Sequence, residues 1–112
     1  MNIAERQVGG VTIVDLRGKL MFGDGDQAFR DAINKVIDSG RLQVVLNMAE
    51  VPYVDSAGIS EIVRTYVTLN KRAGRLKLLD LTRKVQDLLT ITKLLTIFEI
   101  FESEEEAVDS FV

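Results

Sequence analysis

Two hydrophobic periods alternate along this chain of 112 residues. Short apolar runs rich in β-branched residues indicate strands, and apolar residues spaced three and four apart indicate the buried face of a helix. The strand-like runs cover residues 3–8, 11–16, 44–46, 76–81 and 97–101. Helix-like stretches separate and follow them, so the predicted element order is β-β-α-β-α-β-α-β-α.

Each of the three longer helical stretches carries an apolar stripe. The stripes are Phe29, Ile33, Val36 and Ile37, then Ile59, Ile62, Val63, Tyr66 and Val67, and last Val85, Leu88, Leu89 and Thr92. Ser103 is followed three residues later by Glu106, which is the spacing of a capping box. That spacing predicts a fourth, short helix after the last strand.

Residues that favour helix ends flank these stretches. The predicted N-caps are Asp24 (with Gln27 in a capping-box position), either Asp55 or Ser56, and Thr82, and the predicted stops are Gly40 and Gly74. Gly9-Gly10 predicts a hairpin turn between the first two strands.

The alternation of strands and helices predicts an α/β fold with a mixed, mostly parallel sheet and an antiparallel hairpin at its N-terminal side. Val44-Val45-Leu46 suits a strand that is covered on both faces, and Pro52 excludes an ordinary central strand just after it. The length suits one domain over residues 1–112.

Composition removes several classes of function. The chain has no cysteine and no histidine, so thiolate sites, histidine-based zinc sites and Ser-His-Asp catalysis are excluded. The net charge is −3, and no basic stripe favours direct binding of nucleic acid. No apolar run approaches the ~20 residues of a membrane span. We therefore expect a cytoplasmic protein with no cofactor, no metal, no membrane insertion and no enzymatic activity.

Three charged segments are read as ordinary structure. Residues 23–26 lack the spacing of a dinucleotide loop, a P-loop or a calcium loop, and predict a helix-entry loop. The acidic residues 102–106 predict a capped helix start, with a metal or protein contact as the alternative. Arg83 and Lys84 predict a solvated helix face, with an acidic partner as the alternative.

The most informative segment is Asp55-Ser56-Ala57-Gly58, at a strand-to-helix junction. A serine there lies near unpaired backbone N–H groups and the positive end of the helix dipole, where a phosphate is well tolerated. The segment lacks the preceding glycine of a nucleophile elbow, and no histidine exists to activate Ser56. A simple capping role remains open at this point.

This segment resembles the Asp-Ser-Ser/Thr-Gly signature of STAS domains, specifically of bacterial anti-sigma factor antagonists. The resemblance extends over nearly the whole chain. It includes the following segments: Gly18-x-Leu20, Val44 to Asn47, Gly74, Leu76 to Leu79 and Val85 to Leu89.

The resemblance implies a single STAS domain that switches partners. Its unphosphorylated form would bind an anti-sigma factor that is also a serine kinase, and so free a sigma factor. The kinase would then phosphorylate Ser56, and a serine phosphatase would reset the protein. The residues implied in partner binding are Asp55, Ala57, Gly58, Ile59, Met21 and Asp24.

Two positions depart from the family pattern. Ala57 stands where the family has a second Ser or Thr, which leaves Ser56 as the phosphate acceptor. Met21 stands where the family has an acidic residue, and Asp24 or Asp26 would take over its contact with the partner. The alternative function is a STAS scaffold or transporter-associated module that is not phosphorylated.

Overall fold

The computed structural model describes residues 1–111, apart from the side chain of Asp24. The strands are β1 (Asn2–Val8), β2 (Val11–Arg17), β3 (Gln43–Glu50), β4 (Arg75–Leu79) and β5 (Glu99–Phe101). The α-helices are α1 (Asp24–Asp38), α2 (Ser56–Lys71), α3 (Arg83–Ile91) and α4 (Glu104–Asp109), and a 3₁₀ helix, η1 (Leu95–Ile97), precedes β5.

The five strands form one sheet in the order β1-β2-β3-β4-β5. β1 and β2 are antiparallel, and every later neighbour pair is parallel. Gly9 and Gly10 connect β1 to β2 with φ values of 56° and 82°, as a two-residue hairpin turn requires. The predicted α/β class, the hairpin and the mixed sheet are confirmed.

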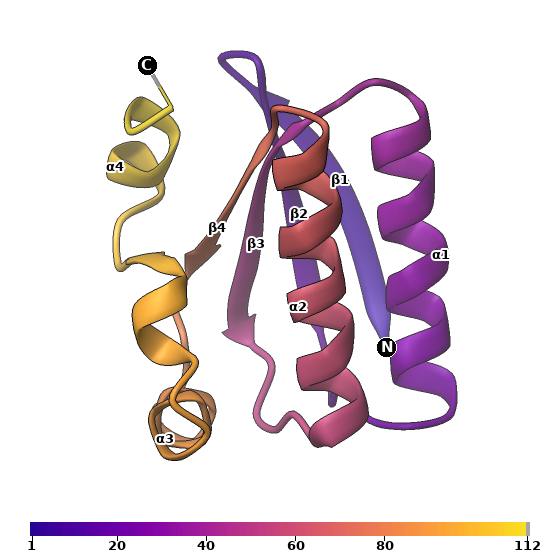
Figure 1. The fold of residues 1–112 in the computed structure, drawn as a ribbon, viewed down its shortest axis with the longest axis vertical. Coiled ribbons are helices and arrows are strands. Elements are labelled where there is room, and N and C mark those ends of the chain that lie inside the picture. The colour runs from indigo at the N-terminus through magenta and orange to yellow at the C-terminus, as the bar shows by residue number, and fades with distance from the viewer. Residues whose placement is uncertain (112) are drawn as a thin grey trace.

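The helices cover the two faces of the sheet unequally. Figure 1 shows α1 and α2 side by side in front of the sheet, with α3 and α4 at the β4 side. The larger core cluster lies under α1, α2 and α3 and includes Val44 and Leu46, while Val45 belongs to a smaller cluster with Ala107 of α4. Because consecutive strand residues point to opposite faces, β3 is buried on both, as predicted.

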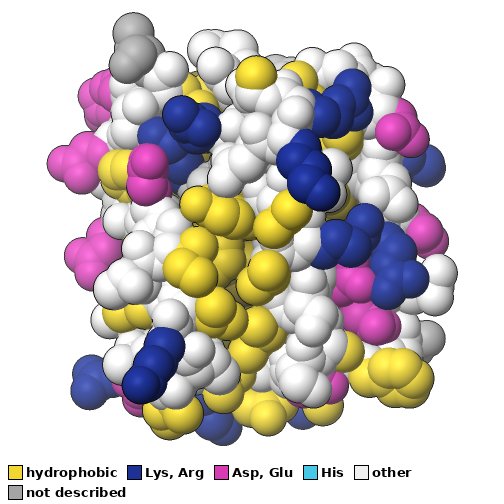
Figure 2. Space-filling model, in the orientation of Figure 1, with side chains coloured by type: hydrophobic (Ala, Val, Ile, Leu, Met, Phe, Trp, Pro, Cys, Tyr) yellow, Lys and Arg dark blue, Asp and Glu magenta, His cyan; other side chains and the backbone are white. Residues whose placement is uncertain are grey.

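The apolar stripe of α2 is confirmed except at Val67, since Ile62 belongs to the core and Ile59, Val63 and Tyr66 pack against it. Val67 is 41% exposed, and the buried positions of α2 are Gly58, Glu61, Ile62, Thr65 and Leu69. Of the polar residues on this face, Thr65 is satisfied within the helix, since its hydroxyl donates to the Glu61 carbonyl at 2.9 Å. Figure 2 shows hydrophobic side chains along the junction between α2 and the segment after α3, where Tyr66 and Leu95 pack on the larger core.

Two element ends also differ. The last strand is shorter than predicted, because Ile97 belongs to η1 and pairing with β4 begins only at Glu99. The left-handed residue after α2 is Ala73, with φ 60°, rather than Gly74. Gly74 instead makes room for the chain, since a Cβ there would lie 2.4 Å from the Leu42 carbonyl oxygen.

Other end signals acted as predicted. Thr82 caps α3 by accepting from the Val85 N–H at 3.4 Å, and Ser103 caps α4 by accepting from the Glu106 N–H at 3.3 Å. β3 ends at Glu50, just before the only proline. These signals succeed because they depend on one or two residues of local chain.

A buried lysine on β4 holds α4 against the sheet. The Lys77 side chain is 5% exposed and pairs with Glu99 at 2.8 Å. Its ammonium donates to the carbonyl and the hydroxyl of Ser110 at 3.0 and 2.7 Å, and lies 4.4 Å from the centre of the Phe111 ring. The sequence pattern of this strand predicted no such role for Lys77.

Candidate partner-binding site around Ser56

The site lies where β3 leads into α2. The β2–α1 loop runs beside this connection, because Leu20 forms an isolated parallel bridge with Val54. The Leu20 N–H donates to the Tyr53 carbonyl at 3.1 Å, and the Asp55 N–H donates to the Leu20 carbonyl at 3.3 Å. These bonds join two loops that are more than 30 residues apart in the sequence. Ser56 follows as the first residue of α2, and it is exposed.

Asp55, and not Ser56, is the N-cap of α2. One carboxylate oxygen accepts from the Gly58 N–H at 3.0 Å, and the other accepts from the Phe22 N–H at 2.9 Å. The bond from Phe22, followed by that from Gly58, lowers the pKa of Asp55 below its ordinary value of 3.8. Asp55 is therefore ionised at neutral pH, and it ties the start of α2 to the β2–α1 loop.

Two glycines let the first turns of α1 and α2 close on the same piece of backbone. A Cβ on Gly58 would lie 2.2 Å from the Leu20 carbonyl oxygen, and a Cβ on Gly25 would lie 2.6 Å from the Lys19 carbonyl oxygen. Gly58 is buried. The space that the missing side chain of Gly58 leaves is thus occupied by this chain's own Leu20.

The N-cap of α1 is not Asp24, the residue predicted from the sequence. α1 begins at Asp24, and Gly23 is its N-cap. A carboxylate oxygen of Asp26 accepts from the Gly23 N–H at 2.8 Å, and Asp26 is only 9% exposed. Asp26 is therefore engaged within the fold, while the side chain of Asp24 lies outside the described residues.

The remaining expected contact residues lie around Ser56 with different exposures. Ala57, Ile59 and Met21 are half-buried. The side chain of Ile59 packs against the larger core. Phe22 lies between the predicted contact residues Met21 and Asp24 and is 83% exposed, although no sequence pattern distinguished it.

A buried carboxylate one turn further along α2 supports the site. The Glu61 side chain is 5% exposed and pairs with Arg30 of α1 at 2.5 Å and with Arg64 at 3.0 Å. Burial alone would raise the pKa of Glu61, but the hydrogen bonds and charges of the two arginines outweigh it, so the pKa lies below its ordinary value of 4.5. The triad of Glu61, Arg30 and Arg64 holds α2 against α1, and no sequence motif predicted it.

The N-terminus of α3 also adjoins the site. The Thr82 hydroxyl donates to the Val51 carbonyl at 3.1 Å, and the Lys84 ammonium lies 5.6 Å from the centre of the Tyr53 ring. Arg83 is exposed and pairs with Asp87 on its own helix. The predicted solvated face at Arg83 and Lys84 is therefore present, and Lys84 places one cation over the connection that leads to Ser56.

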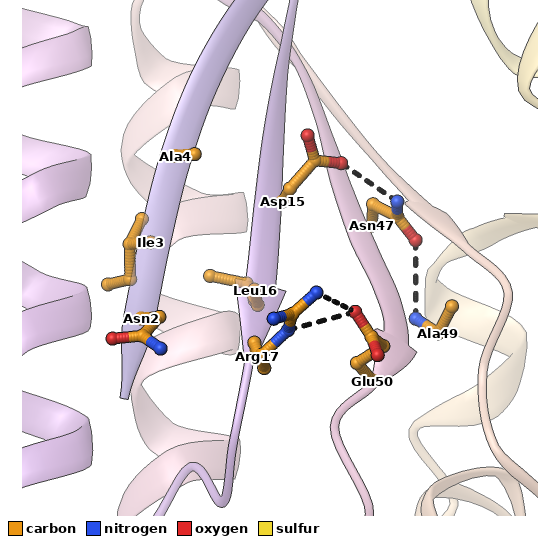
Figure 3. Close-up of a pocket in the computed structure, with 9 residues that line it drawn as sticks. All are labelled: Asn2, Ile3, Ala4, Asp15, Leu16, Arg17, Asn47, Ala49 and Glu50. Atoms are coloured by element: carbon orange, nitrogen blue, oxygen red, sulfur yellow. Dashed lines mark hydrogen bonds and ion pairs between the residues drawn. The ribbon is translucent and has the colours of Figure 1, made fainter.

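A cavity of about 430 Å³ lies elsewhere, on strands β1 to β3 (Figure 3). Four of its polar side chains form two pairs. Asn47 donates to Asp15 at 2.8 Å, and Arg17 pairs with Glu50 at 2.8 Å. None of the residues 55–59 lines it. Among the side chains that the structure describes, no group of three acidic residues is placed to hold a metal ion, and none of the described helices combines the length and the hydropathy of a membrane span.

The fold and the site together define a mixed α/β domain that carries an exposed serine at a helix N-terminus. The STAS domain family matches residues 2–107, so the chain belongs to that family.

Among its relatives is BtrV of Bordetella bronchiseptica, whose description proposes an anti-sigma factor antagonist. It is 27% identical over 99% of this chain and 95% of that protein. An anti-sigma F factor antagonist of Paenibacillus polymyxa is 28% identical over 88% of this chain and 84% of its own length.

Solved structures share the fold. A Thermotoga maritima protein, described as a proposed anti-sigma factor antagonist, superposes with a TM-score of 0.90 at 21% identity, over 96% of this chain and 92% of that chain. The Bacillus cell-fate determinant SpoIIAA, in its phosphorylated form, superposes with a TM-score of 0.77 at 21% identity, over 99% and 100% of the two chains.

Proposed function

We propose that this protein is an anti-sigma factor antagonist that is switched off by phosphorylation of Ser56. In its unphosphorylated form it binds an anti-sigma factor that is also a serine kinase, and so frees a sigma factor. A serine phosphatase restores the binding form. The observation that carries the proposal is an exposed serine at the first position of α2, directly after a capping carboxylate.

The chemistry of the site suits a charge switch. A phosphate adds about −1.5 to −2 charge units beside the ionised Asp55. The helix N-terminus stabilises that charge within this protein while the surface is open to water. A partner packed over Ser56 would have to desolvate the phosphate, which is costly unless a cation lies opposite. The interface can thus be blocked without any change of fold.

The comparisons support the same proposal. The relatives from Bordetella and Paenibacillus carry the description of anti-sigma factor antagonists, and they match 99% and 88% of this chain. The Bacillus protein of the same fold has been solved in a phosphorylated form. In this proposal Ser56 accepts a phosphoryl group and is not a catalytic nucleophile.

The test uses the cognate anti-sigma kinase and ATP, followed by mass spectrometry of the modified protein. We expect one phosphate on Ser56, none on the variant Ser56→Ala, and unchanged labelling of Ser60→Ala. Ser60 is the matched control because it is exposed one turn further along the same helix. Labelling that persists in Ser56→Ala would disprove the assigned acceptor.

Binding separates this function from its alternative. Calorimetry with the same kinase should show that Ser56→Asp binds at least tenfold more weakly than the wild-type protein, because a fixed negative charge occupies the interface. A scaffold or transporter-associated STAS module would keep its complexes in this variant. Its co-purified partners would also lack a kinase.

A further inference from the structure

Phe22 is the most exposed of the large hydrophobic side chains in the described part of the chain. It is 83% exposed, against 77% for Ile91, 44% for Ile97 and 41% for Val67. Single exposed apolar residues are common on protein surfaces and need no explanation by themselves. Phe22 differs because of how firmly its backbone is held and where it is held.

Hydrogen bonds fix the chain on both sides of Phe22. Its own N–H donates to Asp55 at 2.9 Å, and the N–H of the next residue, Gly23, donates to Asp26 at 2.8 Å. The Asp26 N–H in turn donates to the Met21 carbonyl at 2.9 Å. The ring is therefore displayed on a loop that is already ordered, and little backbone entropy remains to be lost when a partner binds.

The same bonds place Phe22 beside the proposed phosphorylation site. The carboxylate that holds its N–H belongs to Asp55, the residue directly before Ser56. A protein interface covers roughly 800 Å² on each partner, a disc of about 16 Å radius. A kinase interface of that size centred on Ser56 therefore reaches the loop that carries Phe22.

We infer that Phe22 is the aromatic anchor through which the anti-sigma kinase docks, and that this kinase has an apolar pocket for the ring beside its catalytic cleft. The inference rests on the proposed function and adds to it the residue that carries affinity. Buried aromatic side chains at the centre of an interface account for much of its binding energy. Half-buried Met21 and Ile59 would form the apolar border of the contact.

The experiment compares four proteins for binding to the cognate kinase by calorimetry and for the rate of Ser56 phosphorylation. They are the wild type and the variants Phe22→Ala, Phe22→Tyr and Ile91→Ala. We expect Phe22→Ala to bind about 30-fold more weakly, which is roughly 2 kcal/mol, and to raise the KM for phosphorylation with little change in kcat. Phe22→Tyr should stay within about threefold of wild type, because the ring is kept.

Ile91→Ala is the matched control, since Ile91 is nearly as exposed but lies at the end of α3. It should bind like wild type. If Phe22→Ala binds within twofold of wild type while Ser56→Asp fails to bind, the anchor is wrong and the switch stands. If the wild-type protein neither binds nor is phosphorylated, the proposed function itself fails. A wild-type dimer that Phe22→Ala dissociates in sedimentation would assign the ring to self-association and overturn the inference.

Discussion

Adding a single methyl group to Gly58 should destabilise this protein, although the same change usually stabilises a helix. Replacing glycine by alanine inside a helix ordinarily gains roughly 0.5–1 kcal/mol. Here the new Cβ would lie 2.2 Å from the Leu20 carbonyl oxygen and 2.6 Å from Cγ1 of Val54. The first of these is a backbone atom of a loop that is itself hydrogen-bonded to the α2 connection, so it cannot rotate away.

The clash sets the expected size of the effect. Carbon and oxygen atoms would have to separate by on the order of 1 Å, and inserting one carbon into a packed site typically costs about 1–3 kcal/mol. Because the clash is with a backbone atom, we take the upper part of that range, about 2–3 kcal/mol. After subtracting about 1 kcal/mol for the gain in helix propensity, we expect Gly58→Ala to lower the free energy of unfolding by roughly 1–2 kcal/mol. With a urea m-value of about 2 kcal/mol/M, the midpoint would fall by roughly 0.5–1 M.

Urea unfolding followed by circular dichroism measures this shift. Ser60→Ala is the control, because Ser60 is exposed on the same helix and its substitution should change stability by less than about 0.5 kcal/mol. Gly58→Ala should also weaken the hydrogen bond from the Asp55 N–H to the Leu20 carbonyl, and amide hydrogen exchange at Asp55 should become faster as a result. If Gly58→Ala is as stable as wild type or more stable, the close packing of α2 on Leu20 is refuted.

Three further changes probe other parts of the structure. Asp55→Ala should speed amide hydrogen exchange at Phe22, because the carboxylate that accepts its N–H at 2.9 Å is lost; unchanged exchange would argue against this clamp. The lowered pKa of Glu61 adds stability that is fully present above about pH 4.5 and is lost as the pH falls through the folded-state pKa. In Glu61→Gln, the free energy of unfolding should therefore fall less steeply as the pH is lowered. At pH 7 this variant should be about 1–2 kcal/mol less stable than wild type, and no more than that because water can still hydrate the two arginines. An equally steep loss of stability in acid would contradict this. Lys77→Met should release α4 from β4 and raise amide exchange in that helix before the sheet unfolds, and continued protection there would show that the ammonium is not its anchor.

The architecture could be predicted from the sequence because its signals are local. Gly9-Gly10 forms a turn whatever the rest of the chain does, and Thr82 caps α3 through an N–H only three residues away. The start of β5 could not be found in this way. Ile97 has a β-branched side chain, which is typical of strands, but pairing with β4 begins only at Glu99. Tertiary packing decides where this pairing begins.

In the candidate site, too, local features could be predicted from the sequence and long-range contacts could not. Ser56 and its neighbours could be proposed as a site from the sequence because they are contiguous and lie between a strand and a helix. The choice of Asp55 as the cap was open, since aspartate and serine are both preferred N-caps. The structure assigns the cap to Asp55, whose two carboxylate oxygens accept one bond each, from the Gly58 N–H of α2 and from the Phe22 N–H of a distant loop. Phe22 itself carries no sequence signal, as an exposed ring is indistinguishable from a core ring until the fold is known.

The packing of Leu20 explains why a charge switch suits this fold better than a conformational one. Leu20 is fully buried, and its backbone lies against the first turns of both α1 and α2 at Gly25 and Gly58. A phosphate on Ser56 would lie beside a loop whose backbone is hydrogen-bonded to the start of α2, so its main effect is electrostatic. Asp55 is ionised before phosphorylation, and the added phosphate raises the local negative charge to roughly −2.5 to −3. A partner that tolerates one carboxylate at the α2 N-terminus would then face a charge that it cannot desolvate without new cations.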